Sequence, residues 1–363
     1  MSGIIYCAEE FRSDHMDNTV WSVFDSGGSM RIDVHTNQRN YPIILEHGVL
    51  NKAKEVIREC GHVFLVSDDG VPEKWRNILK NQYPDAVMHV IPHGEASKNI
   101  STYQEVLSDM LAQHLSRKDT VIALGGGVVG DLAGFCASTY MRGIRFINIP
   151  TTSLAQIDSS IGGKTAIDMN DVKNCVGTFW QPSMVLIDPE VLSTLTPRLM
   201  SEGLAEAVKA GLIRDEKLFE LFEQDDYMDH IDEILYRSLI VKKDVVEHDE
   251  RESGERKLLN FGHTFGHAYE SDEGLGTYLH GECVGMGMMT ILKNEAIKAR
   301  LARVLERLHL PLSCDADPHE VARLVLNDKK ADHGTITIVQ VDEVGKGHLE
   351  QWTMKDIEET LGL

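Results

Sequence analysis

Three histidines and one carboxylate in the second half of the chain have the residue types of a metal site. In the segment 260–267, His263 and His267 are four residues apart, so they share one face if the segment is helical. His280 follows thirteen residues later, and Glu206 stands three residues before Lys209, again a same-face spacing. Two histidines and one glutamate can hold a catalytic zinc and leave positions free for substrate oxygens. The spacing predicts a metal site and leaves open which two histidines bind.

A glycine-rich turn in the first half has the pattern of a nucleotide site. The apolar run 120–124 is followed by Gly125, Gly127 and Gly130, with Asp131 next, in the spacing G-x-G-x-x-G. Such glycines let the backbone approach a pyrophosphate at the free N–H groups of a helix N-terminus. A plain strand–helix turn would use the same glycines, and this turn follows a late strand rather than the first. We predict a dinucleotide site.

Other loops that follow apparent strands have ligand-binding chemistry. Asp68 follows the apolar run 62–67 and could hold a ribose or cap a turn. The loop 92–98 carries Glu95 and Lys98, and Thr151 and Thr152 follow another apparent strand. Because ligands of open α/β sheets bind at strand carboxyl ends, these loops support the dinucleotide prediction.

Cations are few but recur beside polar and small residues. They are Arg142, Lys164 in Gly-Gly-Lys-Thr, Lys173 before Asn174, Lys242, Arg256 and the pair Lys329–Lys330. Each alone is typical of a solvated surface, although Lys164 stands among small and apolar residues. If they converge, they would bind the phosphate and the carboxylate of a small anionic substrate.

The elements that must position these residues change character near residue 197. From Arg31 onward, short β-rich runs alternate with helical stretches, which predicts an α/β domain with a Rossmann-like, mostly parallel sheet. After Pro197 helical periodicity dominates, and only Thr335–Val341 reads as a strand. We predict a poorly ordered leader at 1–29, a nucleotide-binding α/β domain at 30–196 and a mainly α-helical metal- and substrate-binding domain at 197–363.

Composition excludes several classes of protein. The chain has 363 residues with 36 Lys plus Arg against 57 Asp plus Glu, a net charge of −21. This balance argues against nucleic acid and anionic membranes as partners. The six cysteines form no CxxC pair, no apolar run approaches a membrane span, and the N-terminus lacks a secretory h-region. We therefore expect reduced thiols and a cytoplasmic protein.

Six motifs together resemble the 3-dehydroquinate synthase family, in order and with matching spacing over roughly residues 31–363. They lie at 125–135, 140–143, 150–152, 158–166, 203–206 and 259–267. The resemblance implies the second step of the shikimate pathway, in which 3-deoxy-D-arabino-heptulosonate 7-phosphate becomes 3-dehydroquinate and phosphate. It also implies NAD, one divalent metal (Zn²⁺ or Co²⁺), and a lyase overall because NAD is regenerated.

The resemblance also assigns roles by position. It implies metal ligation by Glu206, His263 and His280, and a hydrogen-bonding or proton-transfer role for His267. Arg142 matches an arginine lent to the neighbouring subunit's phosphate site, which implies a homodimer. Substrate contacts would come from Asp158, Lys164, Asn174, Lys209, Lys242, Arg256, Asn260 and Lys330, favoured over Lys329. NAD contacts would come from Asp68, Glu95, Lys98, Gly126, Gly127, Val128, Asp131, Thr151, Thr152, Lys164, Lys173 and Thr194.

Two departures from the family and three rival functions remain. Val172 stands where the family usually has glycine before the Lys-Asn pair, and the leader is longer than in most bacterial members. The rivals are another sugar-phosphate cyclase acting on sedoheptulose 7-phosphate or glucose 6-phosphate, an NAD-dependent polyol dehydrogenase, and an inactive paralogue. The intact Gly-Gly-Lys-Thr-Ala run and the pair Arg256 and Asn260 favour dehydroquinate synthase, whose substrate carboxylate must be held.

Overall fold

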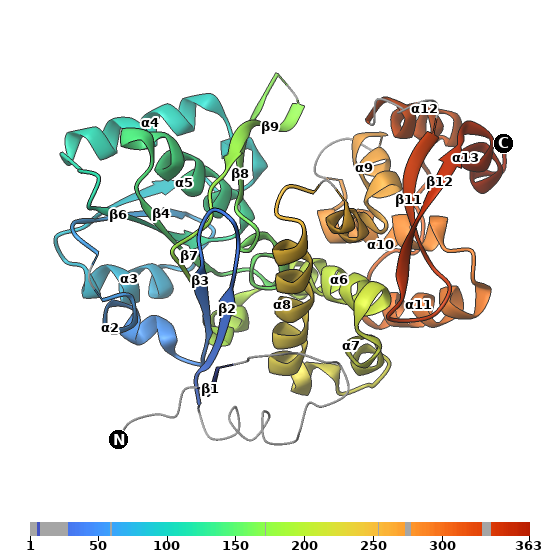
Figure 1. The fold of residues 1–363 in the computed structure, drawn as a ribbon, viewed down its shortest axis with the longest axis horizontal. Coiled ribbons are helices and arrows are strands. Elements are labelled where there is room, and N and C mark those ends of the chain that lie inside the picture. The colour runs from blue at the N-terminus through green and yellow to red at the C-terminus, as the bar shows by residue number, and fades with distance from the viewer. Residues whose placement is uncertain are drawn as a thin grey trace. The chain divides into compact units, whose positions relative to one another are not determined.

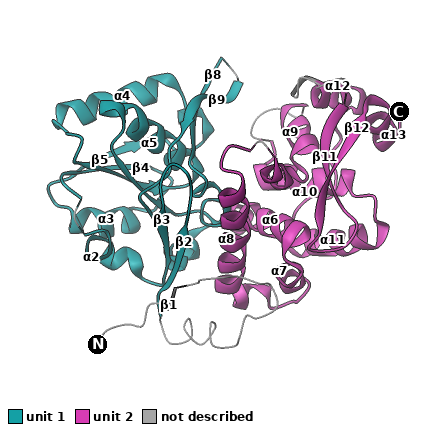
Figure 2. Cartoon of the chain, in the orientation of Figure 1, with its two compact units in different colours: residues 1–196 teal, residues 197–363 magenta. Residues whose placement is uncertain are grey.

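The computed structural model describes residues 6–7, 28–58, 60–170, 172–252, 254–272, 277–328 and 335–363. The chain divides into two compact units, Met1–Thr196 and Pro197–Leu363 (Figure 2). Most of the predicted leader 1–29, and both Lys329 and Lys330, lie outside the described residues. The roles predicted for the two domains remain predictions.

Unit 1 is built on an eight-stranded sheet in the order β1-β2-β3-β10-β7-β6-β4-β5 (Figure 1). Every neighbouring pair is parallel except β2 and β3. This confirms the predicted α/β class and mostly parallel sheet. The strands are β1 (Tyr6–Cys7), β2 (Met30–Val34), β3 (Tyr41–Leu45), β4 (Val63–Asp68), β5 (Val87–Ile91), β6 (Thr120–Gly125), β7 (Arg145–Pro150) and β10 (Met184–Ile187).

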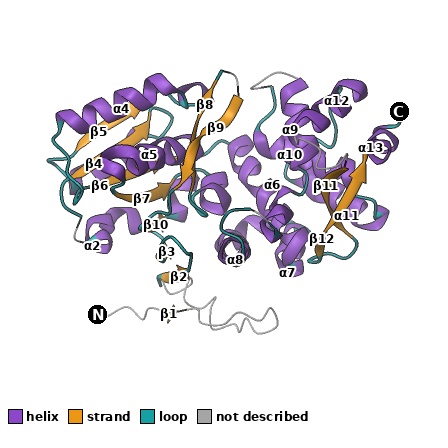
Figure 3. Ribbon diagram, turned by 45° about the horizontal axis from the view of Figure 1, so that its top comes forward, coloured by secondary structure: helices purple, strands orange, loops and turns teal. Residues whose placement is uncertain are grey.

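Helices cover both faces of this sheet (Figure 3). In β4, Leu65 packs into one core with Trp75 of α3, whereas Phe64 and Val66 pack into the other with Phe135 of α5. Successive strand residues alternate between faces, so a strand covered on both faces reads as a continuous apolar run. The helices are α2 (Ala53–Ile57), α3 (Glu73–Gln82), α4 (Ile100–Ala112) and α5 (Gly127–Thr139), with short 3₁₀ turns η1 (Val49–Lys52), η2 (Glu95–Ser97), η3 (Tyr140–Arg142) and η5 (Pro189–Thr194), and one π turn, η4 (Ala155–Ser159).

A β-hairpin that the sequence pattern did not predict follows η4. It consists of β8 (Lys164–Met169) and β9 (Val172–Phe179), which pair antiparallel (Figure 1). No residue of β9 is buried, so the strand has no apolar face to produce an alternating pattern. The hairpin carries Lys164, Lys173 and Asn174, three of the predicted site residues.

Unit 2 is mainly helical, as predicted. Its helices are α6 (Pro197–Arg214), α7 (Glu216–Phe222), α8 (Ile231–His248), α9 (His263–Asp272), α10 (His280–Ile291), α11 (Glu295–Arg307), α12 (Pro318–Asp328) and α13 (Met354–Leu361), with 3₁₀ turns η6 (Tyr227–His230) and η7 (Glu255–Asn260). No helix among the described residues is long and apolar enough to cross a bilayer.

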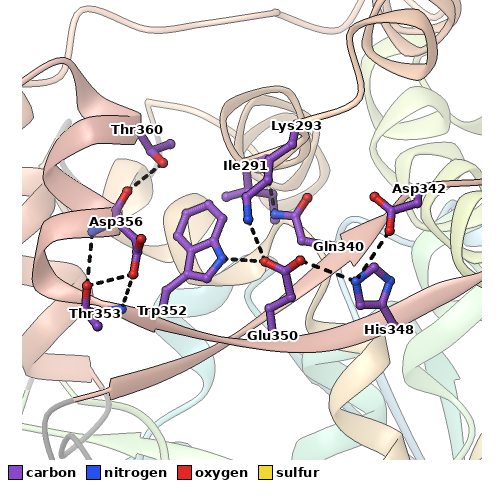
Figure 4. Close-up of polar contacts among 10 residues, drawn as sticks. All are labelled: Ile291, Lys293, Gln340, Asp342, His348, Glu350, Trp352, Thr353, Asp356 and Thr360. Carbon is purple, nitrogen blue, oxygen red and sulfur yellow. Dashed lines mark hydrogen bonds and ion pairs between the residues drawn. The ribbon is translucent and has the colours of Figure 1, made fainter.

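The prediction of a single strand in this half is wrong, because β11 (Thr335–Val341) pairs antiparallel with β12 (Gly347–Thr353). Polar contacts hold β12 in place (Figure 4). Glu350 accepts hydrogen bonds from Lys293 Nζ at 2.6 Å and Trp352 Nε1 at 2.9 Å. Trp352 is the only buried side chain of β12, so the strand reads as polar in the sequence.

Candidate active site

Unit 2 brings one carboxylate and two imidazoles together. Glu206 lies on α6, and His263 and His280 are the first residues of α9 and α10. One ligand atom from each lies within 4.8 Å of the others. The Nε2 atoms of His263 and His280 are 3.5 Å and 3.3 Å from Glu206 Oε1. This is the set that the resemblance implied, and the three residues are close enough together that they could hold one metal ion.

Glycines allow the two histidine-bearing helices to approach closely. A methyl group at Gly266 of α9 would lie 2.9 Å from the carbonyl oxygen of Cys283, and one at Gly287 of α10 would lie 2.8 Å from the nitrogen of Gly266. Gly262, just before α9, has φ +80°, a conformation that other residues rarely adopt. As a result the rings of His263 and His280 are 5.1 Å apart.

The charged groups around Glu206 keep its carboxylate ionised, the form that binds a cation. The carboxylate is 2% exposed and forms an ion pair with Lys209, one turn along α6. Burial favours the neutral acid, but Lys209 and His280 outweigh it and hold the pKa of Glu206 well below its usual range. Burial, reinforced by Lys209, lowers the pKa of His263, so this imidazole stays neutral and able to ligate.

A divalent metal fits these residues. Both oxygens of Glu206 are buried and accept no hydrogen bond of good geometry from the described residues. An anionic carboxylate and a neutral imidazole are the forms in which these groups bind Zn²⁺ or Co²⁺. His267 is exposed, with its ring 5.5 Å from that of His263, and it is outside the group of three possible ligands.

The other polar residues predicted for unit 2 are mostly buried. Lys242 on α8 is 8% exposed, and Arg256 in η7 is 1% exposed. The Arg256 guanidinium donates to the carbonyl oxygen of Glu250 at 2.6 Å. Asn260 Nδ2 donates to Glu252 Oε1 at 2.8 Å. Their substrate contacts remain predictions.

In unit 1, the glycine turn opens helix α5. The helix begins at Gly127, and its cap residue Gly126 provides no side-chain acceptor for the first N–H groups. A methyl at Gly126 would lie 3.0 Å from Thr152, and one at Gly127 would lie 3.2 Å from Ser159 Oγ. The turn is therefore a narrow cradle in which free backbone N–H groups can bind a pyrophosphate, with Val128 in the first helical turn.

Lys98 connects several predicted site residues. Its Nζ lies 2.6 Å from Asp131 Oδ2 and 3.7 Å from Glu95, and it donates to Asn174 Oδ1 on the hairpin. Burial opposes the charge of Lys98, but Asp131, Glu95 and Asp168 raise its pKa. Burial also raises the pKa of Asp131 to about 6, against the attraction of Lys98. The structure thus joins residues predicted for NAD with one predicted for substrate.

Three further residues predicted to contact NAD also make structural hydrogen bonds. Asp68 is buried at the end of β4 and accepts from the backbone of Val71 at 2.9 Å, as a turn-capping residue does; burial raises its pKa. Thr194 Oγ1 accepts from Trp75 Nε1 at 2.9 Å. Thr151 is buried and its N–H donates to the carbonyl of Gly125 at 3.0 Å.

The anion-binding candidates of unit 1 lie on turns. Arg142 is exposed with φ 66°, directly after Met141 at φ 51° and before Gly143 at φ 111°. Asp158 lies in the π turn η4, a form common at functional sites. Lys164 begins β8 with an exposed side chain, which differs from the apolar surroundings expected from its neighbours in the sequence.

A pocket in unit 1 adds residues that the sequence analysis missed. It is lined by Ser159, Ser160 and Trp180 together with Asp131 and Lys164. The hydroxyls of Ser159 and Ser160 and the indole nitrogen of Trp180 are buried and make no hydrogen bond with the described residues. The available signal was the position of the two serines between Asp158 and the Gly-Gly-Lys run.

Two family models cover most of the chain. The model described as 3-dehydroquinate synthase N-terminal matches residues 88–202, and the C-terminal one matches residues 203–331. The chain belongs to the 3-dehydroquinate synthase family. The 3-dehydroquinate synthase of Streptococcus thermophilus (strain CNRZ 1066) is 41% identical over 355 residues, which are 92% of this chain and 99% of the relative. That of Clostridium acetobutylicum is 38% identical over 345 residues, 90% of this chain and 97% of the relative.

Solved structures with the same fold include related cyclases of known ligand content. A 2-deoxy-scyllo-inosose synthase complexed with carbaglucose-6-phosphate, NAD⁺ and Co²⁺ has a TM-score of 0.81 and 25% identity, covering 91% of this chain and 99% of that one. A 2-epi-5-epi-valiolone synthase from Streptomyces hygroscopicus with NAD⁺ and Zn²⁺ has a TM-score of 0.80 and 28% identity, covering 90% of this chain and 97% of that one. A glycerol dehydrogenase from Schizosaccharomyces pombe, at 14% identity and a TM-score of 0.62, covers 88% of this chain and 87% of its own, and it shares the fold.

Proposed function

We propose that this protein is an NAD- and divalent-metal-dependent 3-dehydroquinate synthase that converts 3-deoxy-D-arabino-heptulosonate 7-phosphate to 3-dehydroquinate and phosphate. The observation that carries the proposal is the grouping of Glu206, His263 and His280 in a chain 41% identical to a 3-dehydroquinate synthase over nearly its whole length. The solved cyclases that hold NAD⁺ with Co²⁺ or Zn²⁺ support both cofactors.

The residues present divide the work between the two units. Glu206, His263 and His280 would hold the metal, and the turn Gly126–Val128 with Asp131 and Lys98 would hold NAD. When bound, the metal would stabilise negative charge on substrate oxygens as a Lewis acid, and NAD would take up a hydride and later return it. Oxidation of the substrate allows its phosphate to leave by β-elimination, and return of the hydride regenerates NAD. Ring opening and an intramolecular aldol closure complete the product, so the enzyme is a lyase overall.

The chain's own residues would bind and orient the substrate. Lys209 keeps Glu206 anionic and adds a positive charge beside the metal site. Lys242, Arg256 and Asn260 would hold the substrate's carboxylate and hydroxyls, as ammonium, guanidinium and amide donors do. In unit 1, Asp158, Lys164 and Asn174 would also contact the substrate, with Asp158 accepting hydrogen bonds from its hydroxyls, and Lys173 would contact NAD. His267 would form a hydrogen bond or transfer a proton. Lys330 would complete this set.

We also propose that the protein is a cytoplasmic homodimer. The exposed Arg142, on a turn with two successive left-handed residues, would reach the phosphate site of the partner subunit. Among residues with described side chains, Cys60, Cys136, Cys175, Cys283 and Cys314 are all free thiols, as in reducing compartments.

The substrate is tested by comparing sugar phosphates. Purified protein with NAD⁺ and Zn²⁺ should release phosphate from the heptulosonate phosphate and not from sedoheptulose 7-phosphate or glucose 6-phosphate. If phosphate is released from sedoheptulose 7-phosphate or glucose 6-phosphate in preference to the heptulosonate phosphate, the protein is instead another sugar-phosphate cyclase. This is the second candidate function, and it is supported by the solved structures of two such synthases.

A further inference from the structure

One arginine–glutamate pair fastens the start of α10, the helix that begins at His280. Arg198 Nε donates to Glu282 Oε1 at 2.7 Å, and Arg198 Nη2 donates to Glu282 Oε2 at 2.7 Å. The second oxygen also accepts from the backbone N–H of Leu279 at 2.8 Å. Arg198 Nη2 reaches the carbonyl of Thr277 at 3.1 Å as well. The stretch Thr277–Glu282 is therefore held from both sides of His280.

The same face of α6 holds α10 at three successive levels. Arg198, Glu202 and Glu206 are spaced four residues apart and share that face. Arg198 binds Glu282, the backbone carbonyl of Glu202 abuts Gly281, where an added methyl group would overlap it, and Glu206 faces His280. Helix α10 thus docks on α6 through its first turn, in register with the carboxylate of the metal site.

This anchoring acts at a weak position. The first turn of a helix has N–H groups without intrahelical partners and is where a helix frays most readily. His280 is the first residue of α10, and its side chain is 31% exposed. The side chain of Glu282, in contrast, is 8% exposed, and its carboxylate accepts from both the N–H of Leu279 and the guanidinium.

We propose that Arg198 and Glu282 are positioning residues for the metal site, which hold His280 at the distance from Glu206 that metal binding requires. Neither side chain is a metal ligand in this assignment; they act through the backbone of Thr277–Glu282. The inference rests on the proposed metal site and not on the identity of the substrate. A fixed ligand raises metal affinity because less ordering remains to be done when the ion binds.

The chain provides a matched control in the same unit. Arg300 makes the same two-point contact with Glu223, with Nε to Oε1 at 2.8 Å and Nη2 to Oε2 at 2.7 Å. Arg300 lies on α11 and Glu223 follows the end of α7, and their hydrogen bonds and ion pair are with each other rather than with Glu206, His263 or His280. Breaking this pair tests the effect of losing an arginine–glutamate pair as such.

The experiment measures Zn²⁺ affinity of metal-stripped full-length protein by competition with a chromophoric chelator, without substrate. Arg198→Leu should weaken Zn²⁺ binding about tenfold, and Arg300→Leu should leave it within about twofold of wild type. Arg198→Lys keeps the charge but not the two-point contact, so it should fall between wild type and Arg198→Leu. It also provides the measurement if the leucine variant does not fold.

Two results would overturn the inference. The first is unchanged Zn²⁺ affinity in Arg198→Leu, or in Arg198→Lys if the leucine variant does not fold. The second is a loss of Zn²⁺ affinity in Arg300→Leu equal to that in the Arg198 variant. The melting temperature of the apo proteins is recorded in parallel, because a merely structural role would lower it in both leucine variants without separating their Zn²⁺ affinities. Wild-type protein that binds no Zn²⁺ would instead overturn the proposed metal site itself.

Discussion

The close packing of α9 against α10 gives a sharp test of how the metal site is built. In Gly287→Ala the new methyl group would overlap the carbonyl oxygen of Gly262 and lie 2.8 Å from the nitrogen of Gly266. These are backbone atoms, so no side-chain rotation relieves the overlap. The helices must separate by about 1 Å or more to restore van der Waals distances.

The magnitude follows from that displacement. Overpacking a core costs about 1–3 kcal/mol, and a clash with backbone belongs at the upper end. For a unit of this size, about 3 kcal/mol lowers the melting temperature by roughly 6–12 °C. Since metal–ligand distances tolerate only about 0.2 Å, and His263 and His280 lie on the two separated helices, Zn²⁺ affinity should fall at least about tenfold.

Gly285→Ala is the control on the same helix. Its methyl group would meet only Leu305, at 3.4 and 3.7 Å, which is ordinary contact. It should therefore leave Zn²⁺ affinity unchanged and stabilise α10 by up to about 1 kcal/mol, since alanine favours helix more than glycine does. Thermal unfolding and chelator competition on both variants make the comparison. Equal melting temperatures and equal affinities for the two variants would refute the argument that glycine packing sets the histidine spacing.

Three further predictions concern the charged groups. Glu206→Gln should reduce Zn²⁺ affinity by about 100-fold or more, and it should destabilise the apo protein by about 3–5 kcal/mol because Lys209 loses its buried partner. Chelator competition measures the affinity and urea unfolding measures the stability. A variant that keeps wild-type Zn²⁺ affinity would exclude Glu206 as a ligand. Asp131 has a pKa raised to about 6, so the folded state keeps a proton that the unfolded state loses near pH 4, and stability from this group falls as pH rises between those values. The difference in unfolding free energy between Asp131→Asn and wild type, measured in urea, should therefore shift in favour of the variant by up to about 3 kcal/mol as pH rises from 4 to 7, on top of a constant offset from the lost contact with Lys98. A difference that does not change with pH would contradict the assignment. Mixing inactive Arg142→Ala with inactive His263→Ala subunits should restore some phosphate release, whereas no recovery despite demonstrated subunit exchange would argue against a shared site.

Much of the fold was predictable because both sides of the parallel sheet are covered. Strands such as β4 and β6 are buried along their whole length and appear in the sequence as apolar runs. The glycine-rich turn correctly indicated where α5 begins. Strands β9 and β12 were missed because no residue of β9 and only Trp352 of β12 is buried, and without β9 the short strand β8 had no visible partner. Their pairing depends on backbone hydrogen bonds and, for β12, on contacts such as Lys293 with Glu350 that join distant parts of the chain.

The metal site was predictable in composition but not in detail. Spacing placed His263 and His267 on one helical face and left open which two of the three histidines bind the metal. The structure groups His263 with His280 because α10 docks beside α9, a relation that no local pattern contains. In the same way, the sequence could not distinguish the buried Arg256 from the exposed Lys164, since each stands in a mixed segment and burial is decided by packing.

We propose that the enzyme uses NAD without consuming it, at a metal held by Glu206, His263 and His280. The most direct test follows phosphate and the absorbance of NADH together, with the heptulosonate phosphate, NAD⁺ and Zn²⁺, with and without a chelator. We expect many turnovers of phosphate release with no net formation of NADH, and we expect the chelator to abolish this release. Net accumulation of NADH without phosphate would contradict this proposal and indicate a dehydrogenase.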